Sequence, residues 1–283
     1  MAFFRCGGKM SAGRILTKFK SEIRANLWRL LAIVPRKEDF CRIMNIVVDS
    51  GNTYSKVGWF SGDKLIRYQF GLRFEELIVS IRSDVPERIA YSSVSRSSEE
   101  FKNALKLDIP FLDLTGSTSI PLGINYETPD TLGADRVAAA VGANWLFPNE
   151  NLVVIDMGTC ITYDLINSDG IFHGGLISPG MKMRFSALHT FTKRLPLAEP
   201  NPNPLFIGKS TLKCLQSGVI YGILAEIEGI IEKYRHETST LRVVTCGGDA
   251  PFFESKLKHP IFAVPELVLI GLNRILLHNV ALQ

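Results

Sequence analysis

The chain has 283 residues, of which 46% are hydrophobic and 21% are charged. This composition allows a sizeable buried core in two ordinary domains or one large one, and it excludes a disordered or fibrous protein. No apolar run reaches the roughly eighteen residues that a membrane-spanning helix needs, so we expect no membrane partner. Five scattered cysteines without a C-x-x-C pair argue against a disulfide framework or a zinc site, and favour a cytoplasmic protein with reduced thiols.

The net charge of +4 hides an uneven distribution. Residues 1–43 contain ten Lys and Arg residues and three acids, a balance of +7, so the rest of the chain carries −3. The main part of the protein is therefore mildly acidic and lacks the basic surface that nucleic-acid-binding proteins present. We expect no nucleic-acid partner.

Residues 1–43 form a basic extension that we expect to lie outside the fold. Three interpretations stay open. The segment is translated from a start upstream of a true start at Met44, or it is a basic amphipathic appendage with a helix over 25–34, or it is a transit peptide, which is typically Arg-rich and acid-poor. Met44 lies directly before the first predicted strand, which favours the first interpretation.

From Met44 onward, the hydrophobic periodicity predicts alternating strands and helices. In the first half we expect strands over 45–49, 56–60, 64–70 and 88–94, and helices over 74–82, 98–107 and 131–146. In the second half we expect strands over 152–156, 161–166, 170–176 and 241–245, and helices over 181–194, 210–236 and 265–278. Each half begins with a strand, an acid, a glycine turn and a second strand. This pattern predicts a duplicated α/β unit, with one lobe over 44–148 and the other over 149–283.

Two similar turns carry the chemistry. The segment Asp49–Lys56 places an acid at a strand end, followed by glycine and hydroxyl residues, and Asp156–Asp164 repeats this order 107 residues later. Backbone N–H groups in such a turn can face a phosphate, while the acid can hold Mg²⁺ directly or through water. One turn alone could be an ordinary hairpin, but the repeat indicates that two turns close on one triphosphate. A double glycine in Thr245–Ala250 would let the backbone approach a flat ligand.

These three segments resemble the phosphate-1, phosphate-2 and adenosine segments of the actin, hexokinase and acetate kinase group. The resemblance implies an α/β fold of the duplicated actin-like (ribonuclease H-like) type, with two lobes and mixed sheets flanked by helices.

Further motifs narrow the resemblance to one family. Gly133–Arg136 resembles the G-[AT]-D-R signature of type III pantothenate kinases, and Tyr126 lies seven residues before it, where that family has a substrate tyrosine. Gly174–Gly180, Thr192–Pro196 and Gly208–Gly222 resemble three more runs of the family, G-G-x-I-x-P-G, T-x-x-L-P and G-x-S-T…Q-S-G…G. The resemblance extends from Met44 to about Leu272.

The resemblance implies ATP-dependent phosphorylation of pantothenate to 4′-phosphopantothenate, the first step of coenzyme A biosynthesis, by a cytoplasmic homodimer. The cofactors would be ATP, Mg²⁺ and a monovalent cation, K⁺ or NH₄⁺. Two other functions stay open: a kinase of another small hydroxylated substrate, and a nucleotide-binding regulatory protein without turnover.

The resemblance also assigns roles to individual residues. Asp135 would be the catalytic base, and its neighbour Arg136 should keep it ionised. Asp156 would hold the monovalent cation or Mg²⁺, and Asp49 would hold Mg²⁺, directly or through water. ATP would contact Asp49, Ser50, Gly51, Asn52, Thr53, Tyr54, Ser55, Lys56 and Thr159. Pantothenate would contact Tyr126, Gly133, Ala134, Asp135, Arg136 and Thr192. For Asp164, an indirect role near the second turn and a plain strand-edge position are equally open.

Overall fold

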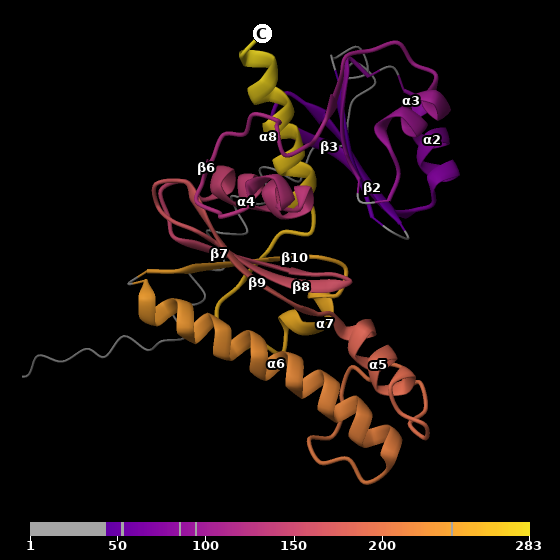
Figure 1. The fold of residues 1–283 in the computed structure, drawn as a ribbon, viewed down its shortest axis with the longest axis vertical. Helices are drawn as coiled ribbons and strands as arrows, with labels where there is room; N and C mark the ends of the chain where they lie inside the picture. The colour runs from indigo at the N-terminus through magenta and orange to yellow at the C-terminus, as the bar shows by residue number, and fades with distance from the viewer. Residues whose placement is uncertain (1–43, 52–53, 85, 94, 239) are drawn as a thin grey trace, which may run out of the picture. The chain divides into compact units, whose positions relative to one another are not determined.

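The computed structural model describes residues 44–283, except residues 52–53, 85, 94 and 239. The predicted basic extension over 1–43 lies outside the described residues. Figure 1 shows the arrangement of the helices and strands that follow.

The first half contains β1 Asn45–Ser50, β2 Ser55–Ser61, β3 Lys64–Leu72, α2 Phe74–Arg82, β4 Arg88–Ser93, α3 Ser98–Leu105, β5 Phe111–Asp113, β6 Gly123–Ile124, a 3₁₀ turn at Pro129–Thr131 and α4 Ala134–Leu146. The second half contains β7 Leu152–Met157, β8 Cys160–Ile166, β9 Ile171–Pro179, α5 Met181–Thr190, α6 Thr211–Glu237, β10 Arg242–Cys246, α7 Ala250–Glu254, β11 Phe262–Ala263 and α8 Leu267–Ala281.

The two sheets repeat one topology. The first has the strand order β3-β2-β1-β4-β5, and the second has β9-β8-β7-β10-β11 with β6 added beside β9. In each sheet the first three strands are antiparallel neighbours, and the last two are parallel to the central strand β1 or β7. This repeat confirms the predicted duplicated α/β fold with mixed sheets.

The differences from the predicted elements lie mainly at short elements and at helix ends. Strands β5, β6 and β11 and helix α7 were not predicted, because two to five residues carry too little periodicity to be recognised. Helix α3 ends before Lys106, which adopts a left-handed conformation with φ of 54°. Helix α5 ends at Thr190 rather than Arg194.

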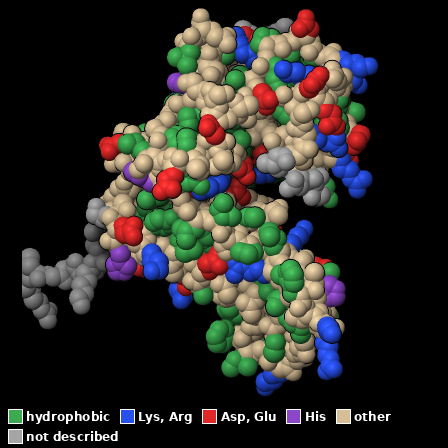
Figure 2. Space-filling view, in the orientation of Figure 1, with side chains coloured by type: hydrophobic (Ala, Val, Ile, Leu, Met, Phe, Trp, Pro, Cys, Tyr) green, Lys and Arg blue, Asp and Glu red, His purple; other side chains and the backbone are tan. Residues whose placement is uncertain are grey.

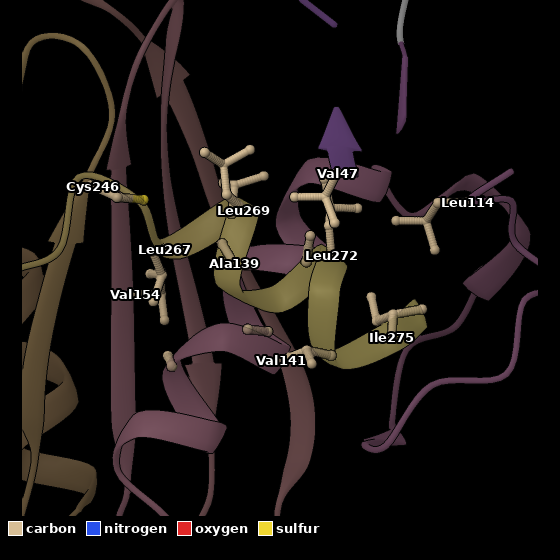
Figure 3. Close-up of a cluster of buried hydrophobic side chains, with 14 of the residues drawn as sticks. Val47, Leu114, Ala139, Val141, Val154, Cys246, Leu267, Leu269, Leu272 and Ile275 are labelled. Atoms are coloured by element: carbon tan, nitrogen blue, oxygen red, sulfur yellow. The ribbon is translucent and has the colours of Figure 1, made fainter. Parts of the chain in front are cut away.

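Helices α4 and α8 form a layer between the two sheets (Figure 1). Their apolar side chains share one core with Val47 and Ala90 of the first sheet and with Val154 and Val244 of the second. Figure 3 shows part of this core, in which side chains of both helices meet those of both sheets. Helices α2 and α3 cover the other face of the first sheet, and α5, α6 and α7 cover that of the second. We call the first sheet with α2 and α3 lobe I, and the second with α5, α6 and α7 lobe II.

Glycines allow the two central helices to cross closely. A Cβ atom on Gly271 of α8 would lie 1.7 Å from the carbonyl oxygen of Ala138 in α4. A Cβ atom on Gly142 of α4 would lie 2.4 Å from the carbonyl oxygen of Leu267 in α8. The backbones therefore approach to a distance that no side chain permits, and this contact fixes α4 against α8.

The expected lobe boundary at 148/149 stays a prediction, and two elements bear on it. Strand β6 comes before this boundary but pairs with β9 of the second sheet. Helix α8 comes after it, yet Asn273 of α8 donates a hydrogen bond to the carbonyl oxygen of Gly62 in the first half, at 2.9 Å. The first half therefore adds a strand to the second sheet, and the second half contributes a helix that contacts the first sheet's hairpin.

Helix α6 is long and apolar enough to cross a membrane by length and composition, although polar residues interrupt its apolar sequence. Its apolar residues are buried against the second sheet, however, with Ile220, Ile223, Ile227 and Ile231 fully covered. This burial is typical of a core helix in a globular domain.

We predict that Gly271→Ala lowers the free energy of unfolding by about 3 kcal/mol or more, because the new methyl group overlaps a backbone carbonyl that cannot retreat. The matched control is Gly229→Ala in α6, where a Cβ atom meets nothing within 4 Å; it should raise stability by about 0.5–1 kcal/mol through helix propensity. Urea unfolding followed by circular dichroism measures both values. Native stability in Gly271→Ala would contradict the close helix crossing.

Candidate active site

The first turn joins β1 to β2. These strands are antiparallel, and Asp49 pairs with Lys56 and Ser50 with Ser55 at the end of the hairpin. The Oγ atoms of Ser50 and Ser55 lie 3.1 Å apart, and the backbone N–H of Gly51 donates to the carbonyl oxygen of Tyr54 at 3.1 Å. The hydroxyl groups and the tip of the turn are therefore held by contacts within the hairpin. The predicted residues Asn52 and Thr53 lie outside the described residues.

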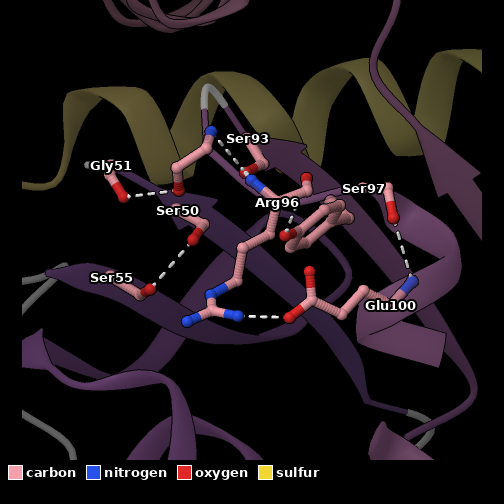
Figure 4. Close-up of polar contacts among 9 residues, drawn as sticks. Ser50, Gly51, Ser55, Ser93, Arg96, Ser97 and Glu100 are labelled. Atoms are coloured by element: carbon pink, nitrogen blue, oxygen red, sulfur yellow. Dashed lines mark hydrogen bonds and ion pairs between the residues drawn. The ribbon is translucent and has the colours of Figure 1, made fainter. Parts of the chain in front are cut away.

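The loop between β4 and α3 supports this turn, a contact that was not predicted from the sequence (Figure 4). The Ser95 hydroxyl donates to the carbonyl oxygen of Gly51 at 3.0 Å. The Ser93 hydroxyl in turn accepts from the backbone N–H groups of Ser95 and Arg96, at 3.2 and 3.0 Å. Two loops of lobe I thus hold the phosphate-1 turn together.

The second turn joins β7 to β8 and repeats this geometry in lobe II. Asp156 pairs with Thr162, and the backbone N–H of Gly158 donates to the carbonyl oxygen of Cys160 at 2.9 Å. The predicted ATP contact Thr159 is exposed at the tip. The N-terminus of α5 lies directly beside it, because the N–H of Gly180 donates to the carbonyl oxygen of Thr159 at 3.0 Å. The positive end of the α5 dipole therefore faces this turn.

The double-glycine segment after β10 packs against the second turn. Gly247 has a φ of +93°, and a Cβ atom there would lie 2.4 Å from the Asp156 Oδ1 atom. The backbone N–H of Asp249 donates to the carbonyl oxygen of Met157 at 2.8 Å. Glycine is therefore required at 247 for both backbone conformation and space. The predicted adenosine segment lies in contact with the predicted phosphate-2 turn.

Three acids share one electrostatic environment in the recess between the lobes. Burial, together with the charges of Asp135 and Asp156 and against the attraction of Lys56, raises the pKa of Asp49 to about 6. Burial and the charge of Asp135 likewise raise the pKa of Asp156, again opposed by Lys56. Figure 2 shows acidic side chains gathered in this recess. The structure thus brings the acids of both turns together with the predicted base.

Lys56 is the cation that acts on both Asp49 and Asp156. Its Nζ atom lies 3.6 Å from the Asp49 Oδ2 atom. Burial lowers the pKa of Lys56, but the charges of Asp49 and Asp156 outweigh that effect and raise it overall. Lys56 therefore stays protonated and can pair with phosphate oxygens when they enter. The buried thiol of Cys246 also acts on the Asp156 carboxylate and lowers its pKa.

The N-terminus of α4 presents Asp135. The backbone N–H of Arg136 donates to the Asp135 Oδ1 atom at 2.8 Å, and a Cβ atom on Gly133 would lie 2.6 Å from the same oxygen. The guanidinium of Arg136 faces Asp164 instead, with Nε 3.0 Å and Nη2 2.5 Å from Oδ1. The Arg136 side chain, which we expected to keep Asp135 ionised, therefore pairs with Asp164 rather than with Asp135. The groups that act on the Asp135 carboxylate are the backbone N–H of Arg136 and the helix dipole.

Tyr126 lies beside Arg136. The Arg136 guanidinium carbon is 5.9 Å from the centroid of the Tyr126 ring. On the other side, a Cβ atom on Gly174 would lie 3.1 Å from this ring, so the glycine leaves room for it. The predicted substrate residues Tyr126, Gly133, Ala134, Asp135 and Arg136 are therefore grouped at the start of α4.

Thr192 is not part of this group. It is exposed after the end of α5, and its hydroxyl donates to the carbonyl oxygen of Leu188 at 2.7 Å. Figure 1 shows α5 well separated from α4. No contact between described residues joins Thr192 to the other predicted substrate residues.

The carboxylates suit a divalent cation that is bound together with a nucleotide. Among the described residues, no group of three or more His, Cys, Asp and Glu side chains is arranged to hold a metal alone. Mg²⁺ needs no such group, because one or two carboxylates, water and substrate phosphates usually complete its shell. Burial of Asp49, together with the nearby charges of Asp135 and Asp156, raises its pKa, so this recess favours added positive charge.

We predict a pH-dependent effect of Asp49→Asn on the unliganded protein. The pKa of Asp49 in the folded protein, about 6, lies above that of an unfolded aspartate, so the wild-type free energy of unfolding falls as the pH rises from about 4 to 6. Asparagine removes that penalty, so the variant should be more stable by about 2 kcal/mol at pH 8 and equally stable at pH 4.

Thermal unfolding at a series of pH values measures this difference. The exposed Asp108→Asn is the control and should show no such trend. A constant difference between Asp49→Asn and wild type across this pH range would show that Asp49 is not in a repulsive buried cluster.

Comparison with known proteins identifies the family. The sequence profile of type III pantothenate kinases matches residues 45–233. A type III pantothenate kinase of Cytophaga hutchinsonii is 47% identical over 237 residues, which cover 84% of this chain and 100% of that protein. One from Bacteroides fragilis is 42% identical over 239 residues, covering 83% of this chain and 98% of that protein.

A crystal structure of a Baf family protein from Campylobacter jejuni has a similar fold, with a TM-score of 0.57 at 24% identity, covering 83% of this chain and 99% of that one. The fold, the spacing of both turns and these sequence matches agree. The chain belongs to the type III pantothenate kinase family.

Proposed function

We propose that the protein transfers the γ-phosphoryl group of ATP to the primary hydroxyl of pantothenate, giving 4′-phosphopantothenate for coenzyme A biosynthesis. One observation carries this proposal beyond family membership. Asp135 at the start of α4 acts electrostatically on both Asp49 and Asp156, the acids that end the first strand of each lobe. This supports the proposal that a base for the alcohol and two acids for a nucleotide-bound cation share one recess.

The nucleotide would lie between the two turns. Residues Asp49–Lys56 and Thr159 would surround the phosphates, with Lys56 and the α5 N-terminus neutralising their charge. Asp49 would hold Mg²⁺, which supplies charge neutralisation on the phosphate oxygens. Asp156 would hold a monovalent cation, K⁺ or NH₄⁺, or contribute to the Mg²⁺ site. The adenosine would lie over Gly247 and Gly248.

The transfer itself requires positioning more than covalent chemistry. The pantothenate hydroxyl oxygen forms a bond to the γ-phosphorus while the bond from that phosphorus to the ADP oxygen breaks. Asp135 accepts the hydroxyl proton and later releases it to solvent. Tyr126, Gly133, Ala134 and Arg136 would hold the pantothenate so that its hydroxyl faces Asp135.

We also infer that the protein works as a homodimer, in the cytoplasm. Between α5 and the start of α6 lie apolar side chains with exposures of 55% to 86%: Phe191, Leu197, Leu205, Phe206 and Ile207. A groove of about 550 Å³ between α5 and α6 adjoins them, lined by Leu188, Leu195 and Leu215 among others. Such a surface fits an interface with a second copy. A second copy there would give Thr192 a route to a pantothenate site.

We predict that Phe206→Asp yields a monomer, because a charge at a buried interface position remains without a partner. Light scattering coupled to size exclusion measures the mass. Val79→Asp, at a 65% exposed position of α2, is the control and should remain dimeric. A dimeric Phe206→Asp variant or a monomeric wild type would contradict the proposed interface.

We predict that Asp135→Asn keeps the fold and the affinity for ATP but lowers kcat by roughly 10²–10⁴-fold, the usual contribution of a general base. A coupled ADP-release assay measures turnover, and titration calorimetry measures ATP binding. Wild-type-like turnover in this variant would remove Asp135 from the role of base.

The same assay tests the function as a whole. The expected result is ADP release that depends on pantothenate and increases with K⁺. ADP release with another small alcohol but not with pantothenate would favour a different kinase. ATP binding without any turnover would favour a nucleotide-binding regulatory protein.

A further inference from the structure

We propose that Asp164 is a positioning residue for phosphoryl transfer: its bidentate ion pair with Arg136 fixes the start of α4, which carries Asp135. This inference rests on the proposed function, because it assigns Asp164 to the same reaction. Asp164 lies in β8, eight residues after Asp156 and 28 residues after Arg136, so the pair joins lobe II to the central helix layer.

The geometry is that of a strong, specific ion pair. The Arg136 Nε atom lies 3.0 Å from Oδ1 and 3.2 Å from Oδ2 of Asp164, and its Nη2 atom lies 2.5 Å from Oδ1. The exposed fractions of the two side chains are 8% and 1%. A guanidinium fork that meets a carboxylate in this way fixes orientation as well as distance.

The surroundings of Asp164 explain why the pair must form in one arrangement. Alternation along β8 places Asp164 on the same face of the sheet as Ile166, toward the core around α4. Its cross-strand neighbour Val154 belongs to the same apolar core. The Thr162 hydroxyl and the Arg136 guanidinium are the groups that stabilise its charge. A carboxylate in such surroundings holds its partner in place, since separation leaves both charges buried and unpaired.

The pair is connected to the reacting groups in two directions. Through the backbone, the N–H of Arg136 donates to the Asp135 Oδ1 atom at 2.8 Å. Through the side chain, the guanidinium lies 5.9 Å from the Tyr126 ring centroid and 5.7 Å from that of Phe172. Fixing the guanidinium therefore fixes both the proposed base and the proposed substrate tyrosine. It also leaves the Arg136 N–H groups that Asp164 does not use free to face Tyr126 and the substrate.

Stability alone does not account for this arrangement. A buried ion pair can often be replaced by packed apolar side chains without loss of stability. The chain contains a comparable pair that is remote from Asp135: Arg242 bonds Glu150 through Nε at 2.6 Å and Nη2 at 2.9 Å. Arg242 also lies over two aromatic rings, those of Phe147 and Phe262. The two pairs match in chemistry, but the Arg242–Glu150 pair is more exposed, at 25% and 40%, and does not adjoin the proposed base.

The test compares Asp164→Asn with the matched control Glu150→Gln. Both changes remove one carboxylate charge from a bidentate arginine pair and conserve volume. We expect Asp164→Asn to lower kcat by about 10- to 100-fold and to raise the KM for pantothenate several-fold, because a displacement of about 1 Å at the base has effects of this size. The KM for ATP should stay within about twofold of wild type. Glu150→Gln should leave kcat and both KM values within about twofold.

Hydrogen exchange gives a readout that does not depend on turnover. The amides of residues 126–137 should exchange faster in Asp164→Asn than in wild type, and at the wild-type rate in Glu150→Gln. If the wild type shows no pantothenate-dependent ADP release, the proposed function is refuted. Hydrogen exchange then still tests whether Asp164 fixes the start of α4.

Three outcomes would overturn the inference. The first is a folded Asp164→Asn variant with wild-type kinetics and exchange. The second is an equal rise in the KM for ATP and for pantothenate. If Asp164→Asn does not fold, the same measurements on Asp164→Glu decide, because that variant keeps the charge but moves the carboxylate by one methylene. The third outcome is that both variants fail to fold while Glu150→Gln folds, which would assign Asp164 a purely structural role.

Discussion

Burial of Asp49 and Asp156 beside the charge of Asp135 is the constraint on which the site depends. One lysine, Lys56, compensates these carboxylates only in part, so the pKa of Asp49 remains raised to about 6. The unliganded recess therefore carries a free-energy cost above that pH. A cation bound with a nucleotide removes this cost, because it neutralises the negative charge that Lys56 alone does not compensate. Binding of the cation and nucleotide therefore stabilises the folded protein.

The central helix layer, α4 and α8, fixes the position of Asp135 relative to both lobes. Helix α4 carries Asp135 at its first turn and packs against α8 through Gly142 and Gly271 farther along. Its start is joined to lobe II through Arg136 and Asp164, and α8 is joined to lobe I through Asn273. The proposed base therefore belongs to neither lobe alone, which suits a residue that must face a nucleotide held by turns of both lobes.

Much of this was predictable from the sequence, for a definite reason. Asp49 and Asp156 end strands of strong apolar character and are followed by glycine, so both the elements and the turns left a clear pattern. The recurrence of that pattern predicted the duplication that the two sheets confirm. The boundaries of long helices such as α6 followed from periodicity in the same way.

What the sequence did not predict depends on contacts between distant segments. The support of Gly51 by Ser95, the pairing of Arg136 with Asp164 and the addition of β6 to the second sheet join residues 28 to 48 positions apart, with no periodic signal. The glycine crossing of α4 and α8 spans more than a hundred residues. The motifs Gly133–Arg136 and Asp156–Asp164 each contained one partner of the ion pair, but no spacing rule joined them.

A crystal structure with Mg²⁺, a non-hydrolysable ATP analogue and pantothenate would test the central claim most directly. We expect the phosphates between the two turns, the cation beside Asp49 or Asp156, and the pantothenate hydroxyl about 3 Å from an Asp135 carboxylate oxygen. A nucleotide bound outside this recess, or a hydroxyl group beyond the reach of Asp135, would contradict it.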